Sequence, residues 1–484
     1  MIVTLDSIDI KTAIEAVEKQ LQEDKQTSAA MKSAVSLVLI IVKLLMVRLG
    51  VNSRNSSVPP ASDPHRDKKR SRQVSGRKPG GQPDHDGSTL KPIAEPDDIR
   101  TLKLDKRTLP AGDYQEVGFE RRQIIDLRIE RYVTEFRAQI LENAQGKRFV
   151  APFPEGVLRP VQYGASVKAK VVYLSMFQLI PYDRVRTHFA ENFDLPISTG
   201  TLANFNCEAY TRLAIIETLA KHCLAQEAVV HADETGINVG GQRLWLHNAS
   251  SAQWTLFHPH AKRGLDAMND IGVLANVRGT LVHDHWKPYY RYDCVHALCN
   301  AHHLRELTYA HEEDAQQWAK AMRDVLLAIN EAVTVAGGVL APKAAALWRR
   351  RYRRILRAAD QECPEPVAPT GAPKRGRIKR SKSRNLLERL RNYEDDVLRF
   401  MENAEVPFTN NQGERDIRMT KVQQKISGCF RSLDGAKTFC RIRSYISTCR
   451  KNGVGVGEAL ECLFNNQWPA FIQRMLDEGV LGAE

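Results

Sequence analysis

The hydrophobic and polar positions divide the chain into segments of different character. Residues 8–25 and 34–47 carry apolar side chains at helical spacing, which predicts two N-terminal helices. Residues 51–90 are rich in Ser, Pro, Gly and basic residues and have almost no apolar positions, which predicts a flexible basic linker. Residues 102–153 switch to short alternating runs that indicate β-strands, and residues 165–215 return to a helical pattern.

The most apolar helix pattern lies near the start of the chain, from residue 34 to residue 47. This run is shorter than the roughly 20 apolar residues of a membrane span and carries Lys43 inside it, so we expect no membrane association. Its apolar residues form one helical face, which consists of Val35, Leu39, Val42, Leu45 and Leu49. Because a single helix cannot bury such a face, we expect residues 1–50 to assemble chains. Docking of this face on the rest of the chain is the alternative.

Two helices separated by a short turn are predicted between residues 182 and 205. Residues 182–193 form the first helix, DLPIS forms the turn, and Ser198 caps a second helix that starts at Thr199. This is the spacing of a helix-turn-helix motif. Any two packed helices give the same pattern, so DNA reading and plain helical packing both stay open.

An apolar strand with a carboxylate at its end is predicted at residues 228–236. The run Ala-Val-Val-His-Ala reaches Asp233, and the chain then leaves the strand through a Thr-Gly pair. A lone aspartate at a strand end is usually a cap or a turn residue. Asp233 therefore needs support from the elements that follow it.

Those elements suit a particular fold class. Alternating runs at 243–248 and 253–258 predict a hairpin with the first strand, a helix is expected at 264–276, and a second apolar strand ends in Asp284. Strand, hairpin, helix and strand is the order of a ribonuclease H-like core, in which the first and fourth strands are adjacent. We therefore expect an α/β fold with a ribonuclease H-like mixed sheet that brings Asp233 and Asp284 together.

A third carboxylate is expected on a helix near residue 414. Either Asn410 or Asn411 can cap this helix. The side chains that share one helical face are Glu414, Arg418, Lys421 and Lys425. The alternative is a solvated face with an ordinary Glu–Arg pair, which stabilises a helix by about 0.2–0.5 kcal/mol.

The composition favours a polyanionic partner. The 484 residues are 43% hydrophobic, which is enough for two to four domains, and 70 Lys and Arg against 57 Asp and Glu give a net charge of +13. Each phosphate contact by a basic side chain releases counterions, so nucleic acid is the leading partner. Residues 343–391 hold 16 basic and 4 acidic residues, so nearly all of the excess lies there.

The cysteines indicate a reducing compartment. Nine cysteines are an odd number without the density of a disulfide scaffold, and the chain start MIVTLDSIDIK lacks the pattern of a secretory signal, so we expect a cytoplasmic protein. The one group with ligand-like spacing consists of Cys294, Cys299, His302 and His303. It can be read as a zinc site or as hydrogen-bonded structural residues, and the short spacing favours the structural reading.

Several motifs together resemble one known family. HADETG, HDHWKPYY, CNAHHLREL and VPFTNNQGERDIRMTKVQQKISGCFRS are similar to the catalytic region of insertion sequence 66 family transposases, and LGVNSRNSSVPPASD with GRKPGGQP resembles the N-terminal region of that family. The resemblance implies that Asp233, Asp284 and Glu414 are the catalytic carboxylates. It also places the Cys-x-x-His of many such transposases on Cys299 and His302, which we expect to orient the core.

The resemblance implies a DNA transposase of a bacterial insertion sequence. Three carboxylates suit two Mg²⁺ or Mn²⁺ ions about 4 Å apart, which support phosphodiester hydrolysis at the element ends and strand transfer of the 3′ ends into target DNA. The expected partners are double-stranded DNA, at the terminal inverted repeats and at the target, a second copy in a homodimer or higher oligomer, and accessory proteins of the same element. A ribonuclease H-like structure-specific nuclease and a non-catalytic DNA-binding regulator are the alternatives.

Two further expectations concern basic residues and zinc. The residues expected to bind DNA phosphates are Arg418, Lys421, Lys425, Lys374, Arg375, Arg377, Lys379 and Arg380. Family members commonly carry a cysteine-rich zinc module before the FP…PVQYG segment, but residues 135–164 contain no cysteine. We therefore predict no structural zinc there.

The patterns and the resemblance together predict a catalytic core interrupted by a helical insertion. The expected segments are an oligomerisation segment at 1–50, a flexible linker at 51–100, a small β-rich module at 101–160, a helical DNA-binding region at 161–225, the first part of the core at 226–306, a helical basic insertion at 307–401, and the second part of the core with C-terminal helices at 402–484.

Overall fold

The computed structural model describes residues 4–5, 8–24, 26–50, 55, 90–366 and 380–481. The chain divides into two units, of which one contains residues 1–66 and 136–484 and the other contains residues 67–135. All the elements discussed below belong to the first unit, except for one short 3₁₀ turn.

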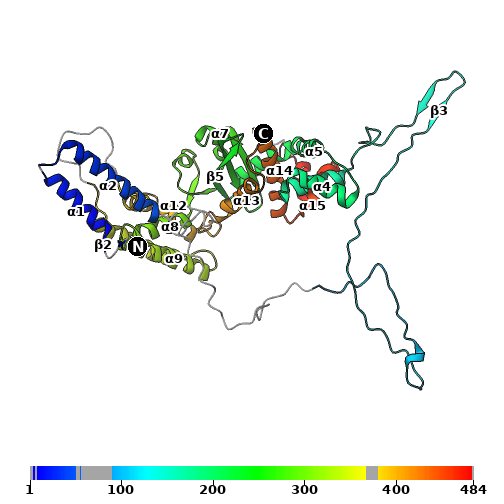
Figure 1. The fold of residues 1–484 in the computed structure, drawn as a ribbon, viewed down its shortest axis with the longest axis horizontal. Helices are drawn as coiled ribbons and strands as arrows, with labels where there is room; N and C mark the ends of the chain where they lie inside the picture. Colours follow the sequence, from blue (N-terminus) through cyan, green and yellow to red (C-terminus); the bar gives the residue numbers. More distant parts are fainter. Residues whose placement is uncertain are drawn as a thin grey trace. The chain divides into compact units, whose positions relative to one another are not determined.

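A five-stranded mixed sheet lies at the centre of the first unit (Figure 1). Its strands are β5 (Val229–Val239), β6 (Gln242–Ser250), β7 (Thr255–His260), β8 (Thr280–His283) and β9 (Val295–Leu298). The spatial order is β7-β6-β5-β8-β9, with β5, β6 and β7 antiparallel and with β8 and β9 parallel to β5. This mixed α/β arrangement is consistent with a ribonuclease H-like core, and it confirms that the first and fourth strands are neighbours.

The first strand is longer than expected. Strand β5 does not end at Asp233 but continues to Val239, because residues 231–239 pair with β6 across a tight turn. Gly240 and Gly241 form this turn with φ of 58° and 84°, a conformation that glycine adopts without steric cost. The predicted exit from the strand through Thr235 and Gly236 was therefore wrong, and Asp233 lies inside the strand.

Helices pack on the sheet and bury its apolar face. Helix α14 (Leu433–Lys451) contacts β7, where the Thr255 and Phe257 backbone N–H groups donate to Thr448 Oγ1 at 3.1 Å and to Ser444 Oγ at 2.8 Å. Further helices that contribute to this core include α6 (Ala214–Gln226), α7 (Leu265–Ile271), α15 (Val456–Phe464) and α16 (Ala470–Asp477). Helix α7 and the 3₁₀ turn Leu274–Asn276 replace the single helix predicted at 264–276.

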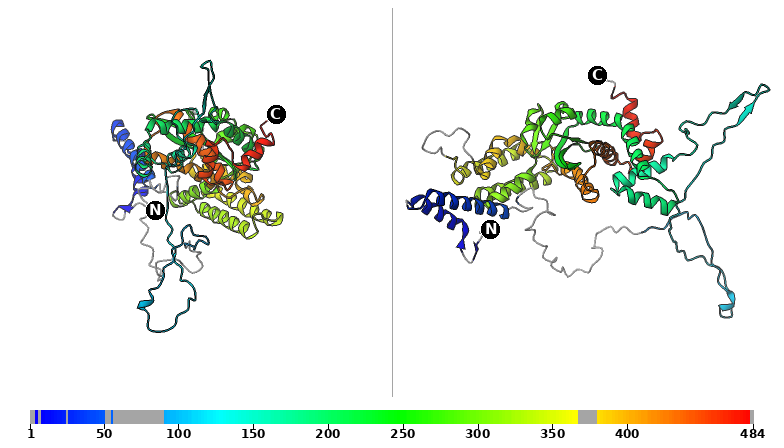
Figure 2. Two further views of the ribbon diagram at one scale, coloured as in Figure 1. Left: turned by 90° about the vertical axis from the view of Figure 1, so that its right-hand side faces the viewer. Right: turned by 45° about the horizontal axis from the view of Figure 1, so that its top comes forward.

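The predicted helical stretch after the second carboxylate is confirmed, and its helices lie together beside the sheet (Figure 2). They are α8 (Asn300–Glu312), α9 (Gln317–Val335), α10 (Pro342–Glu362), α11 (Lys382–Asn392) and α12 (Glu394–Leu398). These helices share a second hydrophobic core with strands β8 and β9, and this core includes Trp318, Tyr352 and Leu387. Part of the basic excess is neutralised within the insertion, because Arg349 and Arg384 each pair with several carboxylates.

The expected helix pair is present as α4 (Tyr182–Phe193) and α5 (Thr199–Arg212). Ser198 Oγ accepts a hydrogen bond from the Thr201 backbone N–H at 3.1 Å, which confirms the predicted cap. Val185, Phe189, Leu202 and neighbouring side chains form a small core with α3 (Ala165–Val172). DNA reading by this pair stays a prediction.

Residues 101–160 have little β-structure. They contain one hairpin, β3 (Ile140–Glu142) and β4 (Arg148–Val150), and one 3₁₀ turn, Lys106–Thr108. The alternating runs at 123–129 and 131–138 form no strands, so the expectation of a β-rich module was wrong. Their large apolar side chains are exposed, and alternation produces a stable strand only where a neighbouring strand and an apolar surface are available.

The N-terminal segment contains two helices, α1 (Ile10–Glu23) and α2 (Ala29–Gly50). They contact each other, and Lys43 pairs with Glu18 at 2.6 Å. Along the predicted stripe, Val35, Leu39 and Val42 are half-buried and Leu45 is exposed, whereas the side chain of Leu49 and most of the linker at 51–90 lie outside the described residues. Helix α2 also exposes Leu37, Val38, Ile40, Ile41 and Leu44. Within the part of the chain that the structure describes, no helix is long and apolar enough to cross a membrane.

Candidate active site

Asp233 and Asp284 lie at the same level of two neighbouring parallel strands. The last paired positions of β5 and β8 are His231 and Val282, and each aspartate follows its paired residue by two positions. Side chains two residues apart on a strand point to the same face. The strand register therefore brings the two carboxylates together. They lie just beyond the end of β8 and just beyond the part of β5 that pairs with β8.

Helix α13 (Asn411–Ser427) carries Glu414 in its first turn and packs against β5 and β6. Asn410 occupies the predicted cap position, but its side chain does not cap the helix, and in this respect the expectation was wrong. Its Nδ2 donates to the Ala232 carbonyl at 2.9 Å, and its Oδ1 lies 2.7 Å from His231 Nδ1. Asn248 Nδ2 donates to the Gly413 carbonyl at 3.2 Å. The start of α13 is thus fastened to the strand that carries Asp233.

Asp284 and Glu414 lie close enough to Asp233 to affect its protonation. Burial raises the pKa of Asp233 well above its ordinary value, and Glu234, Asp284 and Glu414 add repulsion that raises it further. A site with this much negative charge favours a bound cation, because a cation offsets the repulsion between carboxylates.

Glu234 is a fourth carboxylate that sequence reasoning missed. It accepts hydrogen bonds from Tyr289 Oη at 2.5 Å and from Arg263 Nε at 2.9 Å, and Arg263 lies between the rings of Trp245 and Trp286. Burial nevertheless raises the pKa of Glu234. Its position directly after Asp233 in the HADETG motif was the available signal. Because both Glu234 carboxylate oxygens already accept hydrogen bonds from Tyr289 and Arg263, we assign Glu234 a structural role beside Asp233.

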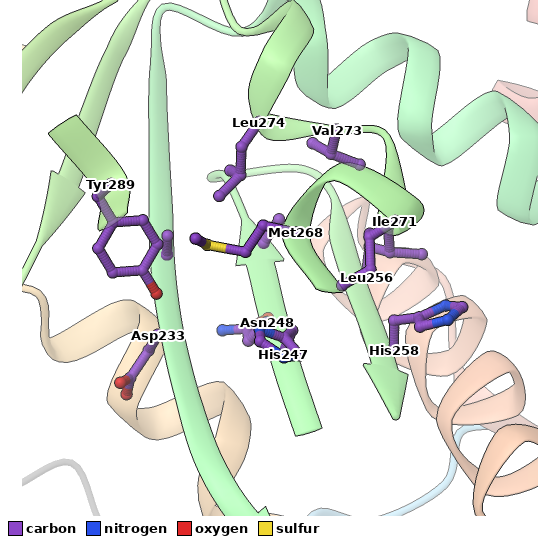
Figure 3. Close-up of a pocket in the computed structure, with 12 residues that line it drawn as sticks. Asp233, His247, Asn248, Leu256, His258, Met268, Ile271, Val273, Leu274 and Tyr289 are labelled. Atoms are coloured by element: carbon purple, nitrogen blue, oxygen red, sulfur yellow. The ribbon is translucent and has the colours of Figure 1, made fainter. Parts of the chain in front are cut away.

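A small hollow lies behind Asp233 and Tyr289 (Figure 3). Apolar side chains make up most of its wall, with Leu256, Met268 and Ile271 among them. The Asp233 carboxylate points away from these side chains (Figure 3). The hollow is therefore a packing feature behind the carboxylate rather than a substrate pocket.

The backbone after Asp284 makes a sharp turn. His285 has φ of 74°, a left-handed conformation that residues other than glycine adopt at an energetic cost. The Trp286 backbone N–H donates to Asp284 Oδ1 at 2.9 Å, and the His285 backbone N–H donates to His283 Nδ1 at 3.1 Å. These bonds hold Asp284 at the end of β8.

Helix α8 places Cys299, His302 and Arg305 beside Glu414. His302 Nδ1 and Arg305 Nη2 each lie 3.8 Å from a Glu414 carboxylate oxygen. Cys299 Sγ accepts a hydrogen bond from the Asn410 backbone N–H at 3.1 Å, and burial raises the pKa of the Cys299 thiol. Arg305 was missed by sequence reasoning, although it lies three residues after His302 on the same helix face.

Cys294 and His303 do not join Cys299 and His302. His303 is buried and lies 3.0 Å from Asn300 Oδ1, and Cys294 lies 4.0 Å from His296. The structure therefore separates the group of four that had been considered as a zinc site.

The residues expected to bind phosphates have different surroundings. Arg418 and Lys425 are exposed on α13. Lys421 Nζ donates to the Gly236 carbonyl at 2.6 Å. Burial of the Lys421 ammonium group and the nearby positive charge of Arg243 both lower its pKa. Arg380 pairs with Glu365 at 2.8 Å. The other predicted phosphate-binding residues lie outside the described residues: Lys374, Arg375, Arg377 and Lys379.

The donor set of Asp233, Asp284 and Glu414 fits a hard divalent ion. Carboxylate oxygens are the protein ligands that Mg²⁺ and Mn²⁺ prefer. Glu414 Oε1 is buried and has no hydrogen-bond partner among the described residues, so it is available as a ligand.

A known protein family matches more than half of the chain. Residues 160–438 match the model of the family described as "Transposase IS66 family". One relative, "Uncharacterized protein y4jO" of Sinorhizobium fredii (strain NBRC 101917 / NGR234), is 27% identical over 164 residues, which cover 33% of this chain and 44% of the relative. The alignment thus spans less than half of that relative's length.

Proposed function

The chain belongs to the IS66 family of transposases, and from this premise we propose that it cuts insertion-sequence ends and joins them to target DNA at a centre of Asp233, Asp284 and Glu414. Family membership implies a DNA transposase. The residue roles, the ions and the two reaction steps are the proposal.

One observation carries the proposal, namely that two strands and one helix bring the three carboxylates together. They are separated by 50 and 129 residues in the sequence, yet their mutual repulsion contributes to the raised pKa of Asp233. A solvated glutamate on a distant surface helix would not affect the pKa of the buried Asp233 carboxyl.

The proposed chemistry assigns a role to each part of the site. Two Mg²⁺ or Mn²⁺ ions, when held by the three carboxylates, would activate a water or a 3′-hydroxyl and stabilise the leaving oxygen. Asp233 and Asp284 are held by the strand register and by the turn at His285, so they provide a rigid side of the site. Asn410 holds the helix that supplies Glu414. No Ser or Tyr nucleophile is required, because the attacking oxygen comes from water or from DNA.

Basic side chains around the carboxylates would position the DNA backbone. Arg418 and Lys425 are exposed on the helix that carries Glu414 and can contact phosphates there. Lys421 supports the contact between α13 and β5 and is a weaker candidate, because its ammonium group already has a carbonyl partner. The segment at 374–380 and the helix pair α4–α5 would extend the contact to flanking DNA.

The remaining segments complete the proposal. Residues 1–50 would join two copies, since pairing of two element ends requires at least a dimer, and residues 51–100 would act as a linker. Residues 161–225 would contact DNA, and residues 226–306 and 402–484 would form the core around the insertion at 307–401. We place the protein in the cytoplasm, where element ends, target DNA and accessory proteins of the element are accessible.

The test uses the full-length protein, a labelled duplex that ends in the inverted repeat flanking the gene, and supercoiled target DNA. We expect Mg²⁺-dependent cleavage at the repeat end and joining of a 3′-hydroxyl end to the target. Asp284→Ala should abolish both reactions and leave binding of the repeat nearly intact.

The two alternatives predict different results in the same assay. A structure-specific nuclease would release nicked product without joining it to the target. A non-catalytic regulator would bind the repeat equally well with and without Asp284 and would produce no cleavage. Either result would contradict the proposed function.

A further inference from the structure

Three different donor atoms meet on the side of Glu414 that faces α8. Ligand atoms of Cys299, His302 and Glu414 all lie within 4.8 Å of one another. In two of these residues a buried polar atom, His302 Nδ1 or Glu414 Oε1, has no hydrogen-bond partner among the described residues. Their separation of 3.8 Å is too long for a hydrogen bond. Buried polar atoms are normally satisfied, so this pair indicates an absent third group.

The chemistry of the donors identifies the kind of group. A thiolate, an imidazole and a carboxylate are the protein ligands of Zn²⁺, with bond lengths of about 2.0–2.3 Å, whereas Mg²⁺ prefers oxygen ligands alone. The three ligand atoms already lie within 4.8 Å of one another, so an ion placed among them would draw the side chains closer together. Three protein ligands leave a fourth position for water.

The surroundings of Cys299 suit a bound thiolate. Cys299 occupies the N-cap position of α8, where the helix dipole and free backbone N–H groups favour negative charge. The Asn410 backbone N–H donates to Cys299 Sγ at 3.1 Å, and such bonds stabilise a thiolate and orient it. Burial opposes ionisation of the free thiol, which a divalent ion at bonding distance would overcome.

We propose that Cys299, His302 and Glu414 bind a Zn²⁺ ion at a site that is distinct from the Mg²⁺ centre. Glu414 belongs to both groups and connects them. An ion bound to Cys299 and His302 would draw the Glu414 carboxylate towards α8 and away from Asp233 and Asp284. Zn²⁺ would therefore act as an inhibitor that competes for one shared ligand. This consequence rests on the proposed function, whereas the binding site itself does not.

The test measures metal binding on the full-length protein without DNA or Mg²⁺, so it can fail independently of the proposed function. Zn²⁺ affinity is measured by competition with a chromophoric chelator, and Co²⁺ serves as a spectroscopic probe because a Co²⁺–thiolate bond has a charge-transfer absorption band. We expect Cys299→Ser to eliminate the band and to weaken Zn²⁺ binding at the tightest site by at least about 10- to 100-fold, the range seen even for loss of an outer-shell partner.

Two further variants make the result specific. His302→Gln should weaken Zn²⁺ binding by a similar factor while keeping a perturbed thiolate band, and it serves as the second test if Cys299→Ser does not fold. Cys294→Ser removes a half-buried cysteine five residues away and should keep both the band and the affinity. Folding of each variant is checked by its circular dichroism melting curve. A wild-type protein without the band, or folded Cys299→Ser or His302→Gln with wild-type Zn²⁺ affinity, would overturn the proposal.

Discussion

The Asn410 side chain lies 2.7 Å from His231 Nδ1, so a residue at the start of one helix is bonded to a strand residue that precedes it by 179 positions. The same side chain donates to the Ala232 carbonyl, directly before Asp233. Through these contacts the position of Glu414 depends on the position of Asp233. The geometry of the carboxylate site is therefore maintained by an amide that does not itself belong to it.

Replacing Asn410 with Ala should destabilise the fold and impair the site. The change leaves two buried polar groups without partners, and we expect a loss of about 1–3 kcal/mol in the free energy of unfolding. Urea unfolding measures this loss, and half-maximal cleavage should require a higher Mg²⁺ concentration than in the wild type. Asn411→Ala is the matched control, because Asn411 is exposed on the same helix turn. Equal stability of the two variants would contradict the assigned role.

Neutralising Asp233 should stabilise the protein in the absence of divalent ions. The pKa of this carboxyl is raised in the folded state, so its protonated form is favoured there and stability is lost as the pH rises through that pKa. Asp233→Asn removes this loss and should raise the melting temperature at pH 7–8. The gain should shrink as the pH falls towards the ordinary value of 3.8.

Mg²⁺ should reverse which of the two proteins, wild type or Asp233→Asn, has the higher melting temperature. A cation that binds only the folded site stabilises it by mass action, and Asp233→Asn lacks one of the ligands. Wild-type protein should therefore gain melting temperature on addition of Mg²⁺, and the variant should gain much less. Equal gains in both proteins would show that the ion binds elsewhere.

The exposed face of α10 should contribute to DNA binding. Four exposed basic residues lie on one side of this helix and form no ion pair with any described residue: Lys343, Arg350, Arg354 and Arg357. Replacing them with Ala should weaken DNA binding without regard to sequence, and each lost phosphate contact should lower the log–log salt slope by roughly 0.9.

The same salt titration tests the neighbouring basic segment. Alanine at Lys374, Arg375, Arg377, Lys379 and Arg380 should also flatten the slope, with a smaller share from Arg380, which pairs with Glu365. Arg353→Ala is the control, because Arg353 lies on α10 with the four exposed basic residues but already pairs with Glu394 of α12. If the salt slope is unchanged in both the α10 variant and the 374–380 variant, these basic residues do not contact DNA phosphates and are only solvent-exposed.

Removing residues 1–50 should change the oligomeric state. Helix α2 exposes large apolar side chains along much of its length, and a second copy would bury them. The truncated protein should become monomeric in a light-scattering measurement, bind single element ends and fail to pair them. A truncated protein that keeps the full-length mass would favour docking of this helix on its own chain.

The sequence allowed much of the central sheet to be predicted, including the neighbouring strands that carry or precede Asp233 and Asp284. Strand order followed from the run of strand, hairpin, helix and strand, because chain connectivity limits which strands can be neighbours. The Ser198 cap was predictable because it depends on local geometry. The continuation of β5 beyond Asp233 was missed, since the pairing of Glu234–Val239 with β6 outweighs the local turn signal of Thr235 and Gly236.

Features that depend on long-range contacts could not be read from local patterns. The contacts of Asn410 with His231 and Ala232 join residues far apart in the chain, and so does the position of Arg305 beside Glu414. The alternation at 123–138 indicated strands, but a period of two does not supply the neighbouring strand that a sheet requires.

Joining of a 3′-hydroxyl end to supercoiled target DNA by Glu414→Gln protein is the most direct test of the central claim, because Glu414 completes the site from a separate helix. The substitution keeps the size of the side chain and removes its charge. We predict that the variant binds repeat DNA within about threefold of wild type and forms at least about 10³-fold less joined product in Mg²⁺, the scale of losing a main source of transition-state charge stabilisation. Joined product at the wild-type yield would contradict the account.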